Sequence, residues 1–203
     1  HHVQNQHAHE FTGLRLRLLM NSLEIFTGAG GLAKGLESAG FHHSAFVEFN
    51  THACESLKVN FDSSKVYCGD IREYDLDQLS SIDVVAGGPP CQPFSLGGKG
   101  KAHDDDRDMF PYAIRAIERL SPKAFVFENV KGLLRESFTE YFEYILMRLT
   151  YPTFQAAGAA DWRQHLKMLK KIDAVEFSDV KYKVQYRLLN AADYGVPQTR
   201  ERV

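Results

Sequence analysis

The chain has 203 residues, of which 44% are hydrophobic and 25% charged, and its formal net charge is -2. This composition is typical of a soluble globular domain, and the charge gives no indication of the basic surface that nucleic-acid-binding domains usually carry. No apolar run approaches the roughly 18 residues of a membrane-spanning helix, and the three cysteines, Cys54, Cys68 and Cys91, form no CxxC pair or metal-ligand pattern. We therefore expect no membrane segment, no disulfide framework, no metal site and a reducing, cytoplasmic setting.

The first residues have the composition of an added tag. His1, His2, His7 and His9 fall within the opening HHVQNQHAHEF, and Met20 would make a natural start. We expect residues 1–19 to be a tag or a vector-derived leader. The functional argument therefore concerns residues 20–203, which show no internal repeat and no clear linker.

Short apolar segments then alternate with helical patterns. We predict strands at 22–27, 45–48, 66–68, 82–86 and 124–127 and a strand-like stretch at 180–189. We predict helices at 31–39, 51–60, 109–120, 138–149 and 160–171. Asn50 or Thr51 could cap the second helix, and we expect the basic end of the last to be a solvated face rather than a contact surface. This alternation predicts an α/β fold whose mostly parallel sheet is covered by helices on both faces. The carboxyl ends of such strands meet at one edge of the sheet, where folds of this kind bind ligands.

The first predicted strand ends in a glycine-rich turn. Gly28, Gly30 and Ala33 satisfy the dinucleotide fingerprint, and Glu48 lies about 20 residues beyond Gly28, where an acid would bind ribose hydroxyls. The pattern predicts an adenosine-bearing cofactor and leaves NAD(P) and S-adenosylmethionine both open. The simpler alternative is a tight turn with no ligand.

Two further side chains follow predicted strands at the same edge. Asp70 follows the third strand, where it could accept a hydrogen bond from an adenine amino group, or it could be a simple turn residue. Cys91 follows the fourth strand within GGPPCQPFS, where Pro90 and Pro93 stiffen the backbone on both sides. A thiol held rigidly in an exposed loop is typical of a nucleophile, and the alternative is an inert free cysteine.

Glu128 directly follows the apolar strand predicted at 124–127. A carboxyl group there is expected to be desolvated, and beside Cys91 it could serve as a proton donor, the alternative being a capping acid. Near the C-terminal end, Gln198, Arg200 and Arg202 alternate, so they would share one face of an extended segment. Guanidinium groups in that position suit carbonyl or phosphate oxygens, and the alternative is a polar strand edge.

Taken in order, these segments resemble the motifs of the DNA cytosine-5 methyltransferase family. SLEIFTGAGG resembles its first motif, residues 47–49 its ribose-binding acid, 69–71 its adenine contact, GGPPCQPFS its catalytic loop, 127–130 its ENV motif and 198–202 its QxRxR motif. The resemblance spans residues 22–203. It implies a Rossmann-like, S-adenosylmethionine-dependent methyltransferase fold that is incomplete at its C-terminal end, the catalytic domain covering residues 20–203.

The resemblance also implies a reaction and a set of residues. A methyl group would pass from S-adenosylmethionine to carbon 5 of a cytosine flipped out of double-stranded DNA, through a covalent adduct with Cys91, leaving S-adenosylhomocysteine and requiring no metal. The implied catalytic residues are Cys91, Glu128, Arg200 and Arg202. The implied cofactor contacts are Phe26, Gly28, Gly30, Glu48, Phe49, Asp70, Ile71, Pro90 and Phe110. The implied contacts with DNA or the flipped base are Gln92, Ser95, Asn129 and Gln198.

The family normally continues with more core strand, a target-recognition domain and a late helical motif. We expect the chain to be either truncated or one subunit of a split enzyme whose second polypeptide carries the target-recognition domain, within a restriction-modification system. Two competing interpretations are a catalytically silent scaffold and an NAD(P)-dependent oxidoreductase. The second of these leaves the PPCQ, ENV and QxRxR segments unexplained, and residues 151–179 have no assigned role.

Overall fold

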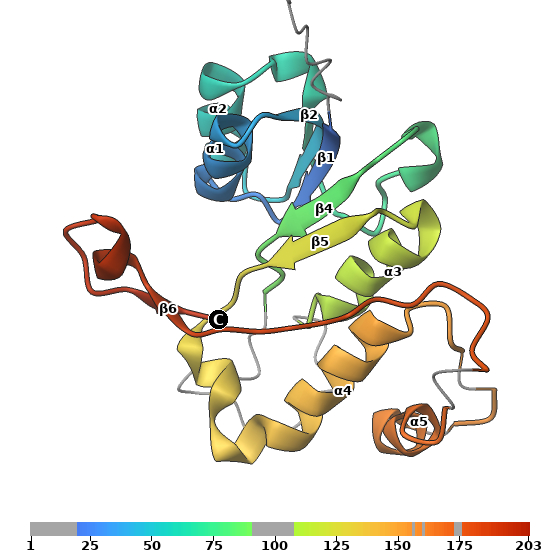
Figure 1. Cartoon of the computed structure of the whole chain (residues 1–203). Helices are drawn as coiled ribbons and strands as arrows, with labels where there is room; N and C mark the ends of the chain where they lie inside the picture. Colours follow the sequence, from blue (N-terminus) through green and yellow to red (C-terminus); the bar gives the residue numbers. More distant parts are fainter. Residues whose placement is uncertain (1–19, 91–107, 156, 160, 173–175) are drawn as a thin grey trace, which may run out of the picture.

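The computed structural model of the chain describes residues 20–90, 108–155, 157–159, 161–172 and 176–203. Its centre is a 5-stranded parallel sheet with the strand order β3-β2-β1-β4-β5 (Figure 1). The elements are β1 (Met20–Ile25), α1 (Gly31–Ser38), β2 (Phe41–Glu48), α2 (Thr51–Asn60), β3 (Val66–Cys68), β4 (Val84–Gly87), α3 (Phe110–Leu120), β5 (Ala124–Phe127), α4 (Thr139–Thr150), α5 (Trp162–Leu169), β6 (Leu189–Asn190) and β7 (Glu201–Arg202). Short 3-10 turns, η1 (Ser63–Lys65), η2 (Leu76–Gln78), η4 (Lys131–Leu134), η5 (Glu136–Phe138) and η6 (Ala191–Tyr194), connect them. The predicted α/β fold with a parallel sheet is confirmed.

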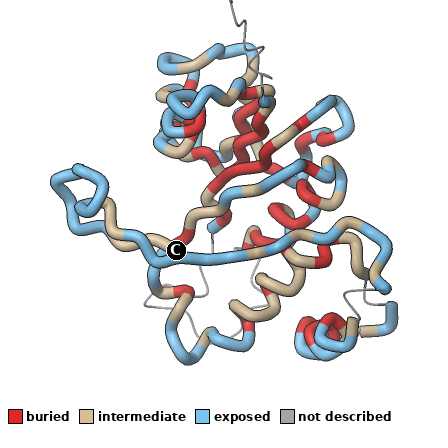
Figure 2. The backbone as a smooth tube through the Cα atoms, in the orientation of Figure 1, coloured by how far each residue is buried: buried red, intermediate tan, exposed pale blue. Residues whose placement is uncertain are grey.

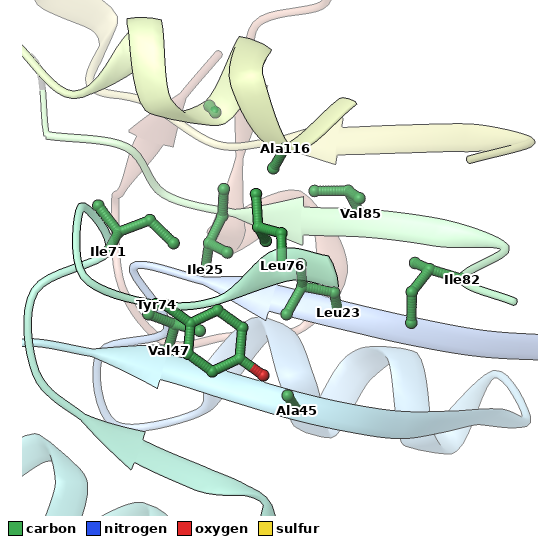
Figure 3. Close-up of a cluster of buried hydrophobic side chains, with 11 residues drawn as sticks. Leu23, Ile25, Ala45, Val47, Ile71, Tyr74, Leu76, Ile82, Val85 and Ala116 are labelled. Atoms are coloured by element: carbon green, nitrogen blue, oxygen red, sulfur yellow. The ribbon is translucent and has the colours of Figure 1, made fainter. Parts of the chain in front are cut away.

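Alternating side chains of β1 and β4 face opposite layers of helices. Leu23 and Val85 belong to a core cluster with residues of α3, which Figure 3 shows in close-up. On the other face, Val84 packs against Leu36 of α1, and Phe46 of β2 packs against Leu57 of α2. The helices therefore cover both faces of the sheet, and the buried residues lie along β1, β2 and β4 and on the packed sides of the helices (Figure 2).

A second core cluster lies between α3, α4 and α5. Ile117, Ile145 and Leu166 are among its fully buried members, and each such side chain contributes roughly 1.5–3 kcal/mol on burial. The lysines near the end of α5, Lys167 and Lys170, face outward as predicted for a solvated face, and Lys170 pairs with Glu143 of α4. The amphipathic helix α5 therefore packs its apolar face into this cluster and leaves its charged face exposed.

Capping residues set the starts of two helices. The Asn50 side chain accepts the Ala53 N–H at 3.1 Å at the start of α2, as the sequence predicts for Asn50 or Thr51. The Asp161 side chain accepts the Gln164 N–H at 2.9 Å at the start of α5. These side chains satisfy backbone donors that a helix cannot pair internally.

The face of the sheet under α1 contains buried polar groups. His43 contacts the Ser22 hydroxyl at 2.9 Å and the Ala33 carbonyl oxygen at 3.0 Å, and burial lowers the pKa of His43. These contacts let β2 begin at Phe41, four positions before the start predicted at residue 45. Glu24 of β1 is fully buried, neither carboxyl oxygen has a hydrogen-bond partner among the described residues, and burial raises its pKa to about 8.

The C-terminal segment leaves the body of the protein as a projecting hairpin (Figure 1). Its ladder is limited to β6 and β7, which pair antiparallel, so the strand predicted at 180–189 is wrong except for Leu189. Residues 180–188 lie along the protein without joining a described ladder. They are held instead by side chains such as Tyr182, whose hydroxyl donates to the Pro122 carbonyl at 2.6 Å and whose ring centroid lies 5.2 Å from that of Phe125.

The cysteines correct another expectation. Cys54 of α2 and Cys68 at the end of β3 form a disulfide with Cα atoms 5.8 Å apart, although the sequence argues against a disulfide framework. The pairing depends on β3 lying beside β2, which brings residues 14 apart in sequence together. Among the described residues no cluster of three or more His, Cys, Asp or Glu suits a metal ion, and no described helix is long and apolar enough to span a membrane.

Candidate active site

A cavity of about 510 Å³ opens at the carboxyl edge of the sheet. This volume lies within the range of small-molecule and cofactor sites. The lining residues lie at or just after the carboxyl ends of β1, β2, β3 and β4 and directly before α3: Phe26, Gly28, Val47, Glu48, Phe49, Asn50, Gly69, Asp70, Ile71, Arg72, Gly88, Pro90 and Met109. The predicted convergence of strand ends at one edge is therefore confirmed by the cavity.

Backbone amides fix the Glu48 carboxylate at the mouth of the glycine turn. One oxygen accepts the Gly28 N–H at 2.7 Å, and the other accepts the Asn50 N–H at 2.7 Å. Gly28 has φ +59°, a left-handed conformation that glycine adopts at little cost. Glu48 is thereby tied to the β1 turn and to the start of α2, and its remaining acceptor capacity suits the hydroxyl groups of a ribose.

Asp70 lies across the cavity from the glycine turn and is paired with Arg72. The Asp70 carboxylate accepts the Arg72 backbone N–H at 2.9 Å and the Arg72 guanidinium Nε–H at 2.9 Å and 3.0 Å. The hydrogen bond from the Arg72 side chain is the main cause that lowers the pKa of Asp70. The cavity therefore contains two oriented carboxylates, Glu48 and Asp70, that come from neighbouring strands.

The base of the proline-rich loop is fixed to its neighbours. Gly87 pairs with β1 so closely that a Cβ there would lie 1.9 Å from the Ile25 carbonyl oxygen, so only glycine fits. The Pro89 carbonyl accepts the buried Asn129 side-chain amide at 2.9 Å, and the Pro90 carbonyl accepts the Met109 N–H at 3.1 Å. Cys91, Gln92 and Ser95 lie outside the described residues.

Glu128 lies next to the base of this loop and forms ion pairs with two arginines. Its Oε1 lies 2.6 Å from Arg202 Nε and 3.7 Å from Arg200 Nη2, and a Cβ on Gly88 of the cavity wall would lie 3.4 Å from Glu128 Oε2. Glu201, which lies between the two arginines in sequence, forms an ion pair with Lys131 instead. The predicted alternation is confirmed for Arg200 and Arg202. The expected desolvation of Glu128 is wrong, because its side chain is 42% exposed and held by ion pairs.

Asn129 joins three distant segments of the site. Its backbone exchanges hydrogen bonds with Val203 at 2.7 Å and 2.9 Å, while its side chain holds Pro89. Asn129 is buried, so in this structure it positions the loop base and the C-terminal strand. A contact between Asn129 and DNA stays a prediction.

Most predicted cofactor residues line the cavity, and two do not. Phe26, Gly28, Glu48, Phe49, Asp70, Ile71 and Pro90 all do so. Gly30 caps α1 instead, and Phe110 packs in the second core cluster, because the first residue of α3 faces Ile114 and Leu133 while Met109 before it faces the cavity. Sequence reasoning treated Asn50 only as a cap and passed over Arg72, although an arginine two positions after Asp70 is a natural partner for that carboxylate.

The chain matches the model of the family described as C-5 cytosine-specific DNA methylase over residues 20–155 and 162–203. It is 41% identical over 182 residues to type II methyltransferase M.NgoMIV of Neisseria gonorrhoeae, covering 90% of this chain and 49% of that protein. It is 36% identical to type II methyltransferase M.NaeI of Lentzea aerocolonigenes, covering 89% of this chain and 38% of that protein. With M.AquIA of Picosynechococcus the identity is 36%, and the chain covers 68% of the relative. The chain thus spans half or less of the first two relatives.

Solved structures show the same fold. A protein described as a DNA modification methyltransferase encoded within an E. coli prophage superposes with a TM-score of 0.59 and 26% identity, covering 90% of this chain and 44% of that one. The S. pombe Dnmt2 methyltransferase gives a TM-score of 0.57 at 16% identity, which supports the fold alone. The Rossmann-like methyltransferase fold expected from the sequence is confirmed.

Proposed function

The chain belongs to the C-5 cytosine-specific DNA methylase family, and from that membership we propose that it forms the cofactor-binding and catalytic part of a DNA cytosine-5 methyltransferase. The observation that carries the proposal is that a cavity and a carboxylate–arginine pair lie side by side at one edge of the sheet. A cavity contains Glu48 and Asp70, and beside its wall Glu128 is paired with Arg202 next to the loop that leads to Cys91.

The cavity fits S-adenosylmethionine by its hydrogen-bond acceptors. Glu48 would accept hydrogen bonds from ribose hydroxyls, and Asp70 would accept one from the adenine amino group. The exposed ring of Phe49 and the side chain of Ile71 offer apolar walls for the adenine. When bound, the cofactor would supply a methyl group activated by its sulfonium.

The residues beside the cavity suit a flipped cytosine. Glu128 would hold ring nitrogen 3 and the exocyclic amine, while Arg202, with Arg200 beside it, would hold the carbonyl oxygen. The Cys91 thiolate would add to carbon 6, which makes carbon 5 electron-rich enough to accept the methyl group, and loss of the carbon 5 proton would then release the cysteine. Gln92, Ser95 and Gln198 would contact the DNA around the extruded base.

The DNA substrate and a further portion of protein complete the proposal. The relatives are longer than this chain, and apolar side chains project from its C-terminal segment, Tyr186, Leu188, Leu189, Tyr194 and Val196. Such a patch is typical of a surface that another part of an assembly covers. We infer that the rest of a methyltransferase, including its target-recognition domain, packs here as the same or a second polypeptide, in a restriction-modification system.

Cofactor binding can be tested on this chain directly. We expect S-adenosylhomocysteine to bind in calorimetric titrations, and Asp70→Asn to weaken that binding by about tenfold or more, because a charge-assisted hydrogen bond to the adenine is lost. Glu55→Gln, in the exposed part of α2, serves as the control and should bind as the wild type does. Binding of NADH without binding of S-adenosylhomocysteine would remove the methyltransferase proposal.

Methyl transfer is tested on the chain joined to its remaining portion. Cys91→Ser should lower methylation of double-stranded DNA by on the order of a thousandfold or more while S-adenosylhomocysteine binding persists. DNA carrying 5-fluorocytosine should trap a covalent complex in wild-type protein and none in Cys91→Ser. A wild type that binds the cofactor product but neither methylates nor traps DNA would favour the silent scaffold.

A further inference from the structure

The Cys54–Cys68 disulfide lies at the rim of the cofactor cavity. Cys54 belongs to the first turn of α2, just after the cavity residues Phe49 and Asn50. Cys68 ends β3 directly before the cavity residues Gly69 and Asp70. The bridge therefore joins the two segments that hold the proposed ribose and adenine acceptors.

Backbone contacts connect the bridge to Glu48. The Glu48 carbonyl oxygen accepts the Gly69 N–H at 2.9 Å and lies 3.3 Å from the Cys54 sulfur. A reduced Cys54 thiol therefore has a hydrogen-bond acceptor already in place. The fold can accommodate both the thiol and the disulfide state without leaving the Cys54 sulfur in an unsuitable environment.

The two sulfurs differ in their access to solvent. Cys54 is 1% exposed, whereas Cys68 is an exposed residue at the strand end. A small thiol or disulfide can therefore reach Cys68 first, and the exchange then passes to Cys54 inside the protein. Where the cell keeps thiols reduced, protein disulfides are mostly transient and redox-sensing, so a permanent structural bridge is not the expected use of this pair.

We propose that Cys54 and Cys68 form a thiol–disulfide exchange site for a low-molecular-weight disulfide such as oxidised glutathione, and that the bridged form binds the cofactor more tightly. The Cys68 thiolate attacks oxidised glutathione and releases one glutathione thiolate, and the Cys54 thiolate then attacks the Cys68 sulfur and releases the second. The protein thiols give up two electrons and two protons, which the two glutathione molecules take up. The inference rests on the proposed function, because its ligand is the adenosyl cofactor.

The bridge tightens binding through preorganisation. It fixes the segment after β2 and the segment after β3 at the spacing that forms the cavity, so less ordering remains for the bound ligand to impose. By thermodynamic linkage, a bridge that raises cofactor affinity by a given factor makes the bound protein harder to reduce by the same factor. Oxidation of the cysteine pair would therefore raise the affinity for the cofactor, and bound cofactor would make the disulfide harder to reduce.

The experiment titrates S-adenosylhomocysteine into the chain after equilibration with reduced or oxidised glutathione, with peptide mapping to identify the bridge. We expect the oxidised wild type to carry a Cys54–Cys68 link and to bind at least about fivefold more tightly than the reduced form. Cys68→Ser and Cys54→Ser should bind like the reduced wild type under both conditions. At half-reduction of the protein, saturating S-adenosylhomocysteine should shift the ratio of squared reduced glutathione to oxidised glutathione. The expected factor is the ratio of the affinities of the oxidised and reduced forms.

Four results would overturn the inference. Equal affinity of the two wild-type forms would remove it and leave the proposed function intact. Failure to find the Cys54–Cys68 link after oxidation would also remove the inference alone. An equal redox response in Cys68→Ser would do the same, because the response would then come from Cys91. Absence of binding in both redox forms would overturn the proposed function together with the inference.

Discussion

The site has a cavity side, which contains Glu48 and Asp70, and an arginine side, formed by Arg200 and Arg202. The two sides are held in place by different kinds of contact. Glu48 is fixed by backbone amides of two neighbouring segments, beside β1, whose last four residues are buried. Arg200 and Arg202 stand instead on a short antiparallel ladder and reach Glu128 through partly exposed ion pairs. The comparison teaches that Glu48 on the cavity side is held by backbone hydrogen bonds at the sheet edge, whereas Arg200 and Arg202 depend on side-chain contacts between segments distant in sequence.

Two glycines provide the largest expected contrast between these regions. Gly87→Ala forces a methyl group against the Ile25 carbonyl and should lower the free energy of unfolding by about 3 kcal/mol. Gly195→Ala, in the projecting hairpin, meets no atom within 4 Å and should cost only about 1 kcal/mol for its left-handed φ of +84°. Urea unfolding followed by circular dichroism measures both losses. Equal losses would contradict the distinction.

The buried carboxyl group of Glu24 gives the next effect. Its pKa is raised from 4.5 to about 8, so across this range the folded state retains a proton that the unfolded chain has released. The free energy of unfolding of the wild type should therefore fall as pH rises from about 4.5 to about 8. Glu24→Gln removes this titration and should lessen the fall by on the order of 3 kcal/mol.

The control for this pH effect is Glu55→Gln on the exposed surface of α2, which should keep the wild-type pH dependence. Urea unfolding at about pH 5, 6.5 and 8 measures the three slopes. If Glu24→Gln and the wild type lose stability in parallel, the carboxyl group does not titrate in the folded protein as its burial indicates.

The smallest expected effect on stability lies at the arginine side. Arg202→Ala breaks a partly exposed ion pair with Glu128, so it should cost less than about 1 kcal/mol of unfolding free energy. The cavity residues remain in place, so S-adenosylhomocysteine binding should change by less than about twofold, while methyl transfer by the completed enzyme should fall sharply. Lys131→Ala, which breaks the ion pair of Glu201 on the opposite face of β7, is the matched control. A large loss of cofactor binding in Arg202→Ala would show that the two sides are coupled.

Sequence patterns were informative where local chemistry decides the structure. Asn50 marks the start of α2, and the apolar runs mark β3 and β5, because capping and strand propensity depend on neighbouring residues. The early part of β2 was missed, since the polar residue His43 is buried only through partners on β1 and α1. The strand predicted at 180–189 failed because an alternating pattern does not specify a neighbouring strand with which to pair.

The same division applies to the candidate site. Glu48, Asp70 and Glu128 could be placed together from sequence because parallel strands bring their carboxyl ends to one edge. The orientation of Phe110 depends on how α3 rotates against the core, and the Cys54–Cys68 pairing depends on the order of strands in the sheet. Both are tertiary properties that no short segment of the chain specifies.

The hydrogen bond between the Pro90 carbonyl and the Met109 amide has a practical consequence. The chain leaves the sheet at Pro90 and is back beside it at Met109, so the two ends already have the geometry of a closed turn. A short glycine-containing linker joining these positions would yield a smaller scaffold that keeps the cavity and lacks Cys91. Such a scaffold would let ligands of the cavity be selected separately from compounds that alkylate Cys91.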